Sequence, residues 1–147
     1  MIALSDPAAT EAWGRRLAHK LRPGDVVALF GSLGAGKTTL ARGILHGLSY
    51  RGEVASPTFP IVLAYDPPEV RLPVRHVDLY RIEHAAELEE LGLEEGRAEG
   101  VLLIEWPDRL PALGPDALRL SLAVAEGGGR ALTAQVPAAW GARWPPR

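Results

Sequence analysis

The stretch Gly31-Ser32-Leu33-Gly34-Ala35-Gly36-Lys37-Thr38 decides the fold of this chain. It fits the pattern G-x-x-x-x-G-K-[ST], in which a glycine-rich loop joins a strand to a helix. An apolar run over residues 26–30 precedes the loop, and apolar residues at helical spacing follow it over residues 39–45. Because the strand and the helix accompany the loop, the sequence predicts a phosphate-binding loop (P-loop) rather than a chance glycine-rich turn.

The residue types of this loop suit a phosphate chain. Glycines let the backbone curl so that successive N–H groups point inward, and the helix that begins near Gly36 adds its own unpaired N–H groups. The Lys37 ammonium can reach the β- and γ-phosphates of a nucleotide, and the Thr38 hydroxyl can coordinate Mg²⁺. We therefore expect a nucleoside triphosphate site at this loop.

The second strong pattern lies at residues 101–106, where four apolar residues are followed by Glu105 and Trp106. This pattern predicts a buried central strand that ends in a carboxylate. A charged residue is rarely buried at such a position unless the strand end opens on a site. In P-loop proteins a carboxylate at this place holds Mg²⁺ or the attacking water. Trp106 would then cap the site or meet a partner.

A predicted strand over residues 74–80 places His76, Asp78 and Tyr80 on one face. Two interpretations stay open, because three polar groups on one face suit either a functional site or an exposed edge strand. Thr10, near the start of a helix that Asp6 is expected to cap, is a weaker candidate for a nucleotide contact.

Two further segments are open to a structural and a functional interpretation. The loop that holds Ser56 and Thr58 on either side of a proline is an ordinary turn or a switch that senses the γ-phosphate and Mg²⁺. Residues 83–99, with seven glutamates and one arginine, form a solvated helix or an acidic docking surface.

Size and composition favour a single domain over residues 1–147. The formal net charge of −2 gives no overall electrostatic footprint for nucleic acid, so an RNA contact would need a local patch or a partner. No run of membrane-spanning length, no signal peptide and no cysteine are found, and we expect a soluble cytoplasmic protein. A hairpin is predicted over residues 118–136, and the tail over residues 137–147 is expected to be loose unless a tryptophan docks.

Several classes of P-loop protein do not fit this sequence. The chain contains no asparagine, so the guanine-reading motif Asn-Lys-x-Asp cannot exist. The segment after Thr58 offers no arginine-rich lid of the kind common in small-molecule kinases, and a helicase would need a larger and more basic chain. A small ATPase remains, with a nucleotide-binding regulatory module that hydrolyses little as the alternative.

Four blocks together resemble one known family. They are the P-loop with Arg42-Gly43, Ser56-Pro57-Thr58-Phe59, His76-x-Asp78-Leu79-Tyr80-Arg81 with Leu91-Gly92-Leu93 after it, and Ile104-Glu105-Trp106-Pro107. In this order and spacing they resemble the bacterial TsaE family, formerly YjeE, the ATPase of tRNA threonylcarbamoyladenosine biosynthesis. The resemblance runs from about residue 10 to residue 130. One departure is Ser32, where family members often carry aspartate.

The resemblance implies an α/β protein, with a P-loop NTPase-type three-layer fold, a mixed, mostly parallel sheet and a C-terminal antiparallel hairpin. It also implies that ATP and Mg²⁺ are the cofactors. The implied nucleotide-binding residues are Thr10, Gly34, Ala35, Gly36, Lys37, Thr38, Thr39 and Arg130. Thr38 and Glu105 would hold the metal, and Lys37, Asp78 and Glu105 would serve hydrolysis. Ser56, Thr58, His76 and Trp106 are the candidates for switch or partner contacts.

The resemblance further implies that the protein works with partners. Family members join the TsaD and TsaB proteins, which transfer threonylcarbamoyl to an adenosine beside the tRNA anticodon. The TsaE protein does not perform the transfer, and its ATP hydrolysis resets the complex. We therefore expect a Mg²⁺-dependent ATPase that is weak alone and stimulated by its partners, with tRNA contacted only through the complex and no membrane involved.

Overall fold

The computed structural model describes residues 1–32, 34–55, 62–80, 82, 86, 92–106 and 115–147, apart from the side chain of Glu94. The predicted switch residues Ser56 and Thr58, and most of the glutamate-rich segment, lie outside these described residues. The described strands are β1 (Ile2–Leu4), β2 (Val26–Phe30), β3 (Val62–Tyr65), β4 (Val74–Asp78), β5 (Val101–Glu105), β6 (Leu118–Val124) and β7 (Arg130–Gln135). The described helices are α1 (Pro7–Ala18), α2 (Lys37–Gly47), α4 (Leu93–Glu99) and the 3-10 helix η2 (Ala138–Arg143).

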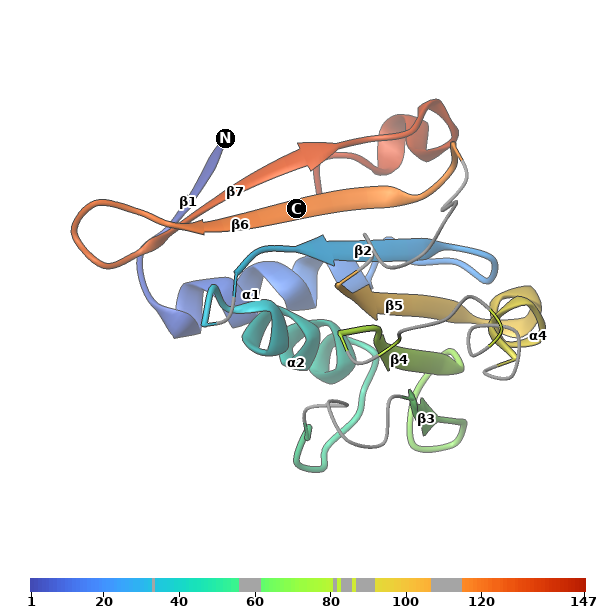
Figure 1. Cartoon of the computed structure of the whole chain (residues 1–147). Coiled ribbons are helices and arrows are strands. Elements are labelled where there is room, and N and C mark those ends of the chain that lie inside the picture. The colour runs from blue at the N-terminus through green and yellow to red at the C-terminus, as the bar shows by residue number, and fades with distance from the viewer. Residues whose placement is uncertain (33, 56–61, 81, 83–85, 87–91, 107–114) are drawn as a thin grey trace.

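These strands form one mixed sheet in the order β1-β7-β6-β2-β5-β4-β3 (Figure 1). Strands β6, β2, β5 and β4 run parallel at the centre. Antiparallel pairs flank them, with β3 beside β4 on one side and β7 and β1 beyond β6 on the other. The predicted α/β fold is confirmed, including its C-terminal antiparallel hairpin, in which Leu122 of β6 lies opposite Leu132 of β7.

The parallel centre brings several strand ends to one edge of the sheet. Phe30, Glu105 and Asp78 end β2, β5 and β4 at this edge. Strand β6 runs parallel to β2 and turns here into β7, so Arg130 at the start of β7 lies at the same edge. Strand β1 pairs with β7, with Leu4 opposite Arg130, which brings the beginning of α1 to this edge as well.

Helices α1 and α2 lie together on one face of the sheet (Figure 1). Helix α1 begins at Pro7 because the Asp6 carboxylate accepts a hydrogen bond of 2.8 Å from the Ala9 N–H, as the sequence predicts. The two helices approach closely at Gly43, where a Cβ atom would lie 2.2 Å from the Glu11 carbonyl oxygen. None of the helices in the described ranges is long and apolar enough to cross a membrane.

Apolar side chains cover both faces of the central strands. The larger cluster fills the space between the sheet and helices α1 and α2, and includes Leu17, Leu40 and Leu103. The second cluster, on the opposite face, includes Ala28 and Ile104. Strands β2 and β5 contribute to both clusters, which is why their sequences are continuous apolar runs rather than alternating ones.

The C-terminal tail is packed, because its tryptophans dock. Trp140 in η2 is 2 % exposed, and the Trp144 ring meets the Trp13 ring of α1 edge-on, with 5.9 Å between centroids. The Arg143 guanidinium donates hydrogen bonds of 2.7 and 3.2 Å to the Asp25 carboxylate. The alternative that the sequence left open, a tail held by a docked tryptophan, is therefore the one found, and the contacts of Trp144 with Trp13 and of Arg143 with Asp25 join the tail to distant parts of the sequence.

We expect Trp140→Ala to lower the free energy of unfolding by about 3–5 kcal/mol, because it removes a fully buried ring from the core. Urea denaturation of the full chain measures this change. Val124→Ala is the matched control, since Val124 is 62 % exposed and a surface substitution changes stability by only about 0.5 kcal/mol or less. Equal effects of the two substitutions would contradict the docked tail.

Candidate functional site

A cavity of about 310 Å³ lies at the edge where the parallel strands end. Its lining combines the P-loop with the ends of β4, β5 and the β6–β7 hairpin, through Ser32, Gly34, Gly36, Lys37, Thr38, Thr39, Asp78, Tyr80, Glu105, Trp106 and Arg130. The structure thus brings together most of the predicted site residues. Of the others, Thr10, Ala35 and His76 do not line this cavity, and Ser56 and Thr58 lie outside the described residues.

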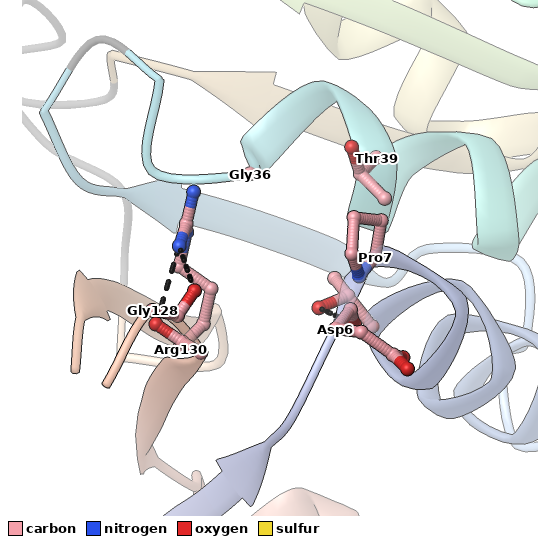
Figure 2. Close-up of a pocket in the computed structure, with 8 residues that line it drawn as sticks. Asp6, Pro7, Gly36, Thr39, Gly128 and Arg130 are labelled. Atoms are coloured by element: carbon pink, nitrogen blue, oxygen red, sulfur yellow. Dashed lines mark hydrogen bonds between the residues drawn. The ribbon is translucent and has the colours of Figure 1, made fainter. Parts of the chain in front are cut away.

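A smaller cavity of about 110 Å³ adjoins the first and shares Gly36, Thr39 and Arg130 with it. Figure 2 shows how the start of α1, the start of α2 and the hairpin surround this smaller cavity. Its further lining residues are Asp6, Pro7, Thr10, Gly128 and Gly129. The sequence singled out Thr10, Gly36, Thr39 and Arg130 of this lining as nucleotide-binding candidates. It did not single out Asp6 and Pro7, which reach the cavity through the pairing of β1 with β7, or Gly128 and Gly129 in the turn of the β6–β7 hairpin.

The backbone of the P-loop is shaped by glycines with positive φ angles. Gly34 and Gly36 have φ angles of 78° and 105°, in a region that side chains disfavour. The Ala35 N–H donates to the Ser32 carbonyl at 3.1 Å, and the helical ladder of α2 starts with the bond from the Leu40 N–H to the Gly36 carbonyl at 2.9 Å. Gly36 offers no side-chain cap, so the first N–H groups of α2 face the cavity without one.

The Lys37 side chain is 6 % exposed and folds back across the P-loop. Its ammonium donates hydrogen bonds to the carbonyl oxygens of Gly31 and Ser32, and lies 3.8 Å from the centroid of the Trp106 ring. Trp106 adopts a positive φ angle of 60°, which is strained for a large side chain, and its ring packs on that of Tyr80 with 4.8 Å between centroids. The lysine charge is therefore held at the cavity by carbonyl dipoles and a ring face.

The Arg130 guanidinium ties the hairpin to the P-loop. It donates to the carbonyl oxygens of Ala35 at 2.9 Å and Gly34 at 3.1 Å. It also donates to the carbonyl oxygens of Gly128 at 3.0 Å and Gly129 at 3.2 Å (Figure 2). Its planar fork of donors thus fixes two loops from distant parts of the sequence in one arrangement.

Two carboxylates lie side by side on the opposite wall, because Asp78 and Glu105 face each other in the parallel register of β4 and β5. Asp78 accepts a hydrogen bond of 2.8 Å from the Tyr80 N–H. Glu105 lies 2.7 Å from the imidazole Nε2 of His76, which is fully buried. The alternative of an exposed edge strand is wrong, since β4 lies between β3 and β5; Tyr80 follows the end of β4 and is 44 % exposed.

Thr10 is 1 % exposed, and its hydroxyl donates to the Asp6 carbonyl at 3.4 Å while it lines the smaller cavity. Thr38 and Glu105 supply a hydroxyl and a carboxylate to the larger one. No group of three or more metal-binding His, Asp or Glu side chains occurs among the described residues. A hydroxyl and a carboxylate are oxygen donors of the kind that suit Mg²⁺, which keeps several waters and takes few protein ligands.

The fold and the loop define an α/β protein of the P-loop NTPase type. The family model described as "Threonylcarbamoyl adenosine biosynthesis protein TsaE" matches residues 4–132, and the chain therefore belongs to the TsaE family.

Individual relatives agree with this assignment. The chain is 44 % identical over 115 residues to the tRNA threonylcarbamoyladenosine biosynthesis protein TsaE of Synechocystis sp., covering 75 % of this chain and 71 % of the relative. It is 45 % identical over 111 residues to the protein of the same description from Streptomyces coelicolor, and the match covers 74 % of this chain and 75 % of that relative. Among solved structures, the crystal structure of Bacillus subtilis YdiB matches with a TM-score of 0.79 and 31 % identity, covering 95 % of this chain and 86 % of that one.

We expect Arg130→Ala to loosen the P-loop locally. Losing hydrogen bonds from a charged donor should lower the free energy of opening at the Ala35 amide by about 1–3 kcal/mol, while amides in β5 keep their protection. Native-state hydrogen exchange measures the free energy of opening at the Ala35 amide and at the amides of β5. Arg51→Ala, which removes an exposed arginine that is not part of the cavity lining, is the control. Unchanged exchange at Ala35 would show that Arg130 does not hold the loop.

Proposed function

We propose that this protein binds and hydrolyses ATP with Mg²⁺, as a component of the machinery that forms N6-threonylcarbamoyladenosine in tRNA next to the anticodon. The observation that carries the proposal is the single cavity lined by Lys37, Thr38 and Glu105 together. Membership of the TsaE family and the printed description of its relatives support the tRNA modification. Because that modification is made on tRNA, we place the protein in the cytoplasm.

The P-loop would bind the phosphate chain through backbone N–H groups and the lysine. The carbonyl oxygens that now accept from Lys37 are weaker partners than an anion, so its ammonium would move to the β- and γ-phosphates. Gly36, Thr39 and Arg130 line both cavities, and a ligand seated on the P-loop can extend from one into the other. The smaller cavity beside Thr10 is therefore where we place the nucleoside part of ATP.

Thr38 and Glu105 are the residues that would hold Mg²⁺. The ion neutralises charge on the phosphates and on the transition state of phosphoryl transfer. Asp78 lies beside Glu105 and is 4 % exposed, so its carboxylate is available to orient a water molecule at the same wall of the cavity. We assign hydrolysis to Lys37, Asp78 and Glu105 acting together.

The charges of the cavity suggest why a partner is needed. Among the described lining residues, Lys37 and Arg130 carry positive charge, and Arg130 already donates to four backbone carbonyls. Phosphoryl transfer accelerates strongly when a further cation meets the transition state, as with an arginine supplied in trans. We propose that the TsaD–TsaB pair completes the site, and that tRNA is contacted through this complex.

We expect Lys37→Ala to weaken ATP binding roughly 10- to 150-fold, since a hydrogen bond to a charged group worth about 1.5–3 kcal/mol is lost. Isothermal titration of ATP in Mg²⁺ measures the affinity. Lys20→Ala is the control, because Lys20 is the other lysine of the chain and lies after the end of α1, away from the cavity lining. An unchanged affinity would remove the P-loop from the proposal.

We expect the purified protein to hydrolyse ATP slowly and the TsaD–TsaB pair to raise its rate. A cation supplied in trans raises such rates by about 10³–10⁵-fold in the best-known cases, and this is the largest stimulation that we expect from the pair. Steady-state phosphate release with and without the pair measures the stimulation. If the protein alone is as fast as the mixture, the partner part of the proposal fails, whereas the absence of hydrolysis in both would favour a regulatory nucleotide-binding module.

A further inference from the structure

We propose that His76 is a positioning residue that holds the Glu105 carboxylate in the orientation needed at the cavity. The inference rests on the proposed function, in which Glu105 is a ligand of Mg²⁺. It goes beyond that function because His76 itself does not line the cavity. Its imidazole would act only through Glu105.

The contact is short, buried and directional. The Nε2 atom of His76 lies 2.7 Å from Oε2 of Glu105, and the two residues are 0 % and 3 % exposed. Their strands are paired so that His76 lies opposite Leu103 while Glu105 lies opposite Asp78, which makes the contact a diagonal one on a single face of the sheet. In the proposed arrangement Nε2 of His76 donates and the Glu105 carboxylate accepts, since a carboxylate that binds a metal has no proton to donate.

A glutamate at a strand end has three side-chain torsions, and this hydrogen bond restricts them. It engages Oε2 of a carboxylate whose residue lines the cavity. Partners that orient a metal-binding side chain in this way affect metal affinity or activity about 10- to 100-fold when they are removed. The neighbouring Asp78 is fixed differently, by accepting the Tyr80 N–H at 2.8 Å. Each of the two carboxylates on this wall therefore has its own support.

The chemistry of the position also argues against a purely structural histidine. His76 lies on the face that carries the large apolar cluster, with Val74 and Leu103 among the nearby members. Its Nδ1 atom is buried and has no hydrogen-bond partner among the described residues. An apolar side chain of similar size would avoid this unsatisfied atom. The Nε2 donor to Glu105 is the contact that such a side chain would not supply.

The test compares three substitutions of His76 that differ in donor geometry. His76→Gln keeps an amide N–H near the position of Nε2. His76→Leu keeps volume without a donor, and His76→Asn keeps an amide that is too short to reach Glu105. The readout is the dissociation constant of a non-hydrolysable ATP analogue measured by titration calorimetry in EDTA and in Mg²⁺. The ratio of the two constants reports the contribution of the metal separately from nucleotide binding, and Glu105→Gln gives the value expected when the metal-binding carboxylate is lost.

We expect the three His76 variants to bind the analogue in EDTA with an affinity close to that of the unsubstituted protein, because His76 does not line the cavity. In His76→Leu and His76→Asn, the tightening of analogue binding by Mg²⁺ should fall toward the value for Glu105→Gln, by up to the roughly 10- to 100-fold typical of such partners. In His76→Gln this tightening should stay near normal. Thermal melting checks that each variant is folded.

The outcomes separate this inference from the proposed function. If the unsubstituted protein binds the analogue equally well with and without Mg²⁺, the proposed metal site itself is wrong. If Glu105→Gln loses the gain but His76→Leu and His76→Asn keep it, only the role of His76 is overturned. A loss in His76→Gln equal to that in His76→Leu overturns it as well, since the donor would then not matter. Failure of both the Leu and Asn variants to fold would assign the contact to stability alone and overturn the inference.

Discussion

The parallel pairing of β2 with β5 is the constraint on which the rest of the structure depends. Its register sets Leu29 opposite Glu105, so the strand that leads into the P-loop and the strand that ends in the carboxylate stop at the same level. Both strands are buried on their two faces, so apolar residues are favoured along their whole length. Burial disfavours a charged residue in β5 except at the final position, where the strand leaves the core and lines the cavity.

The antiparallel half of the sheet closes the site from the other side. Because β6 runs parallel to β2 and then returns as β7, the first residue of β7 meets the P-loop, and Arg130 bonds to the Gly34 and Ala35 carbonyls. Strand β1 pairs with β7, and this pairing places the start of α1, with Thr10, at the smaller cavity. The strand order thus places Arg130, from the C-terminal part of the sequence, where its side chain supports the loop over residues 31–38.

Local patterns predicted the parts of this architecture that depend on neighbouring residues. Short stretches of sequence predict three parts of the fold, because each has its own periodicity or turn chemistry. They are the P-loop with its strand and helix, the strand over residues 101–105 that ends in a carboxylate, and the C-terminal hairpin. The α/β fold followed from their order and from the family resemblance.

Contacts set by register or by long-range packing could not be predicted in this way. The contact between His76 and Glu105 requires knowing that β4 pairs with β5 and how the strands are offset, which neither strand's sequence states. The docking of the tail depends on Trp13 and Asp25, which meet Trp144 and Arg143 more than a hundred residues later in the sequence. The binding of ATP and Mg²⁺ and the partnership with TsaD and TsaB remain proposals, because they concern molecules outside this chain.

The balance of charge in the cavity connects these features to the chemistry. Two cations, Lys37 and Arg130, face two carboxylates, Asp78 and Glu105, so the described lining is formally neutral. A nucleoside triphosphate brings more negative charge than one divalent ion neutralises, and the transition state of phosphoryl transfer concentrates charge on the transferred group. Arg130 cannot turn toward that group without releasing the P-loop carbonyls that it holds. Among the described residues, the cavity lining therefore serves binding better than turnover, and in the proposed function the TsaD–TsaB pair supplies the further positive charge.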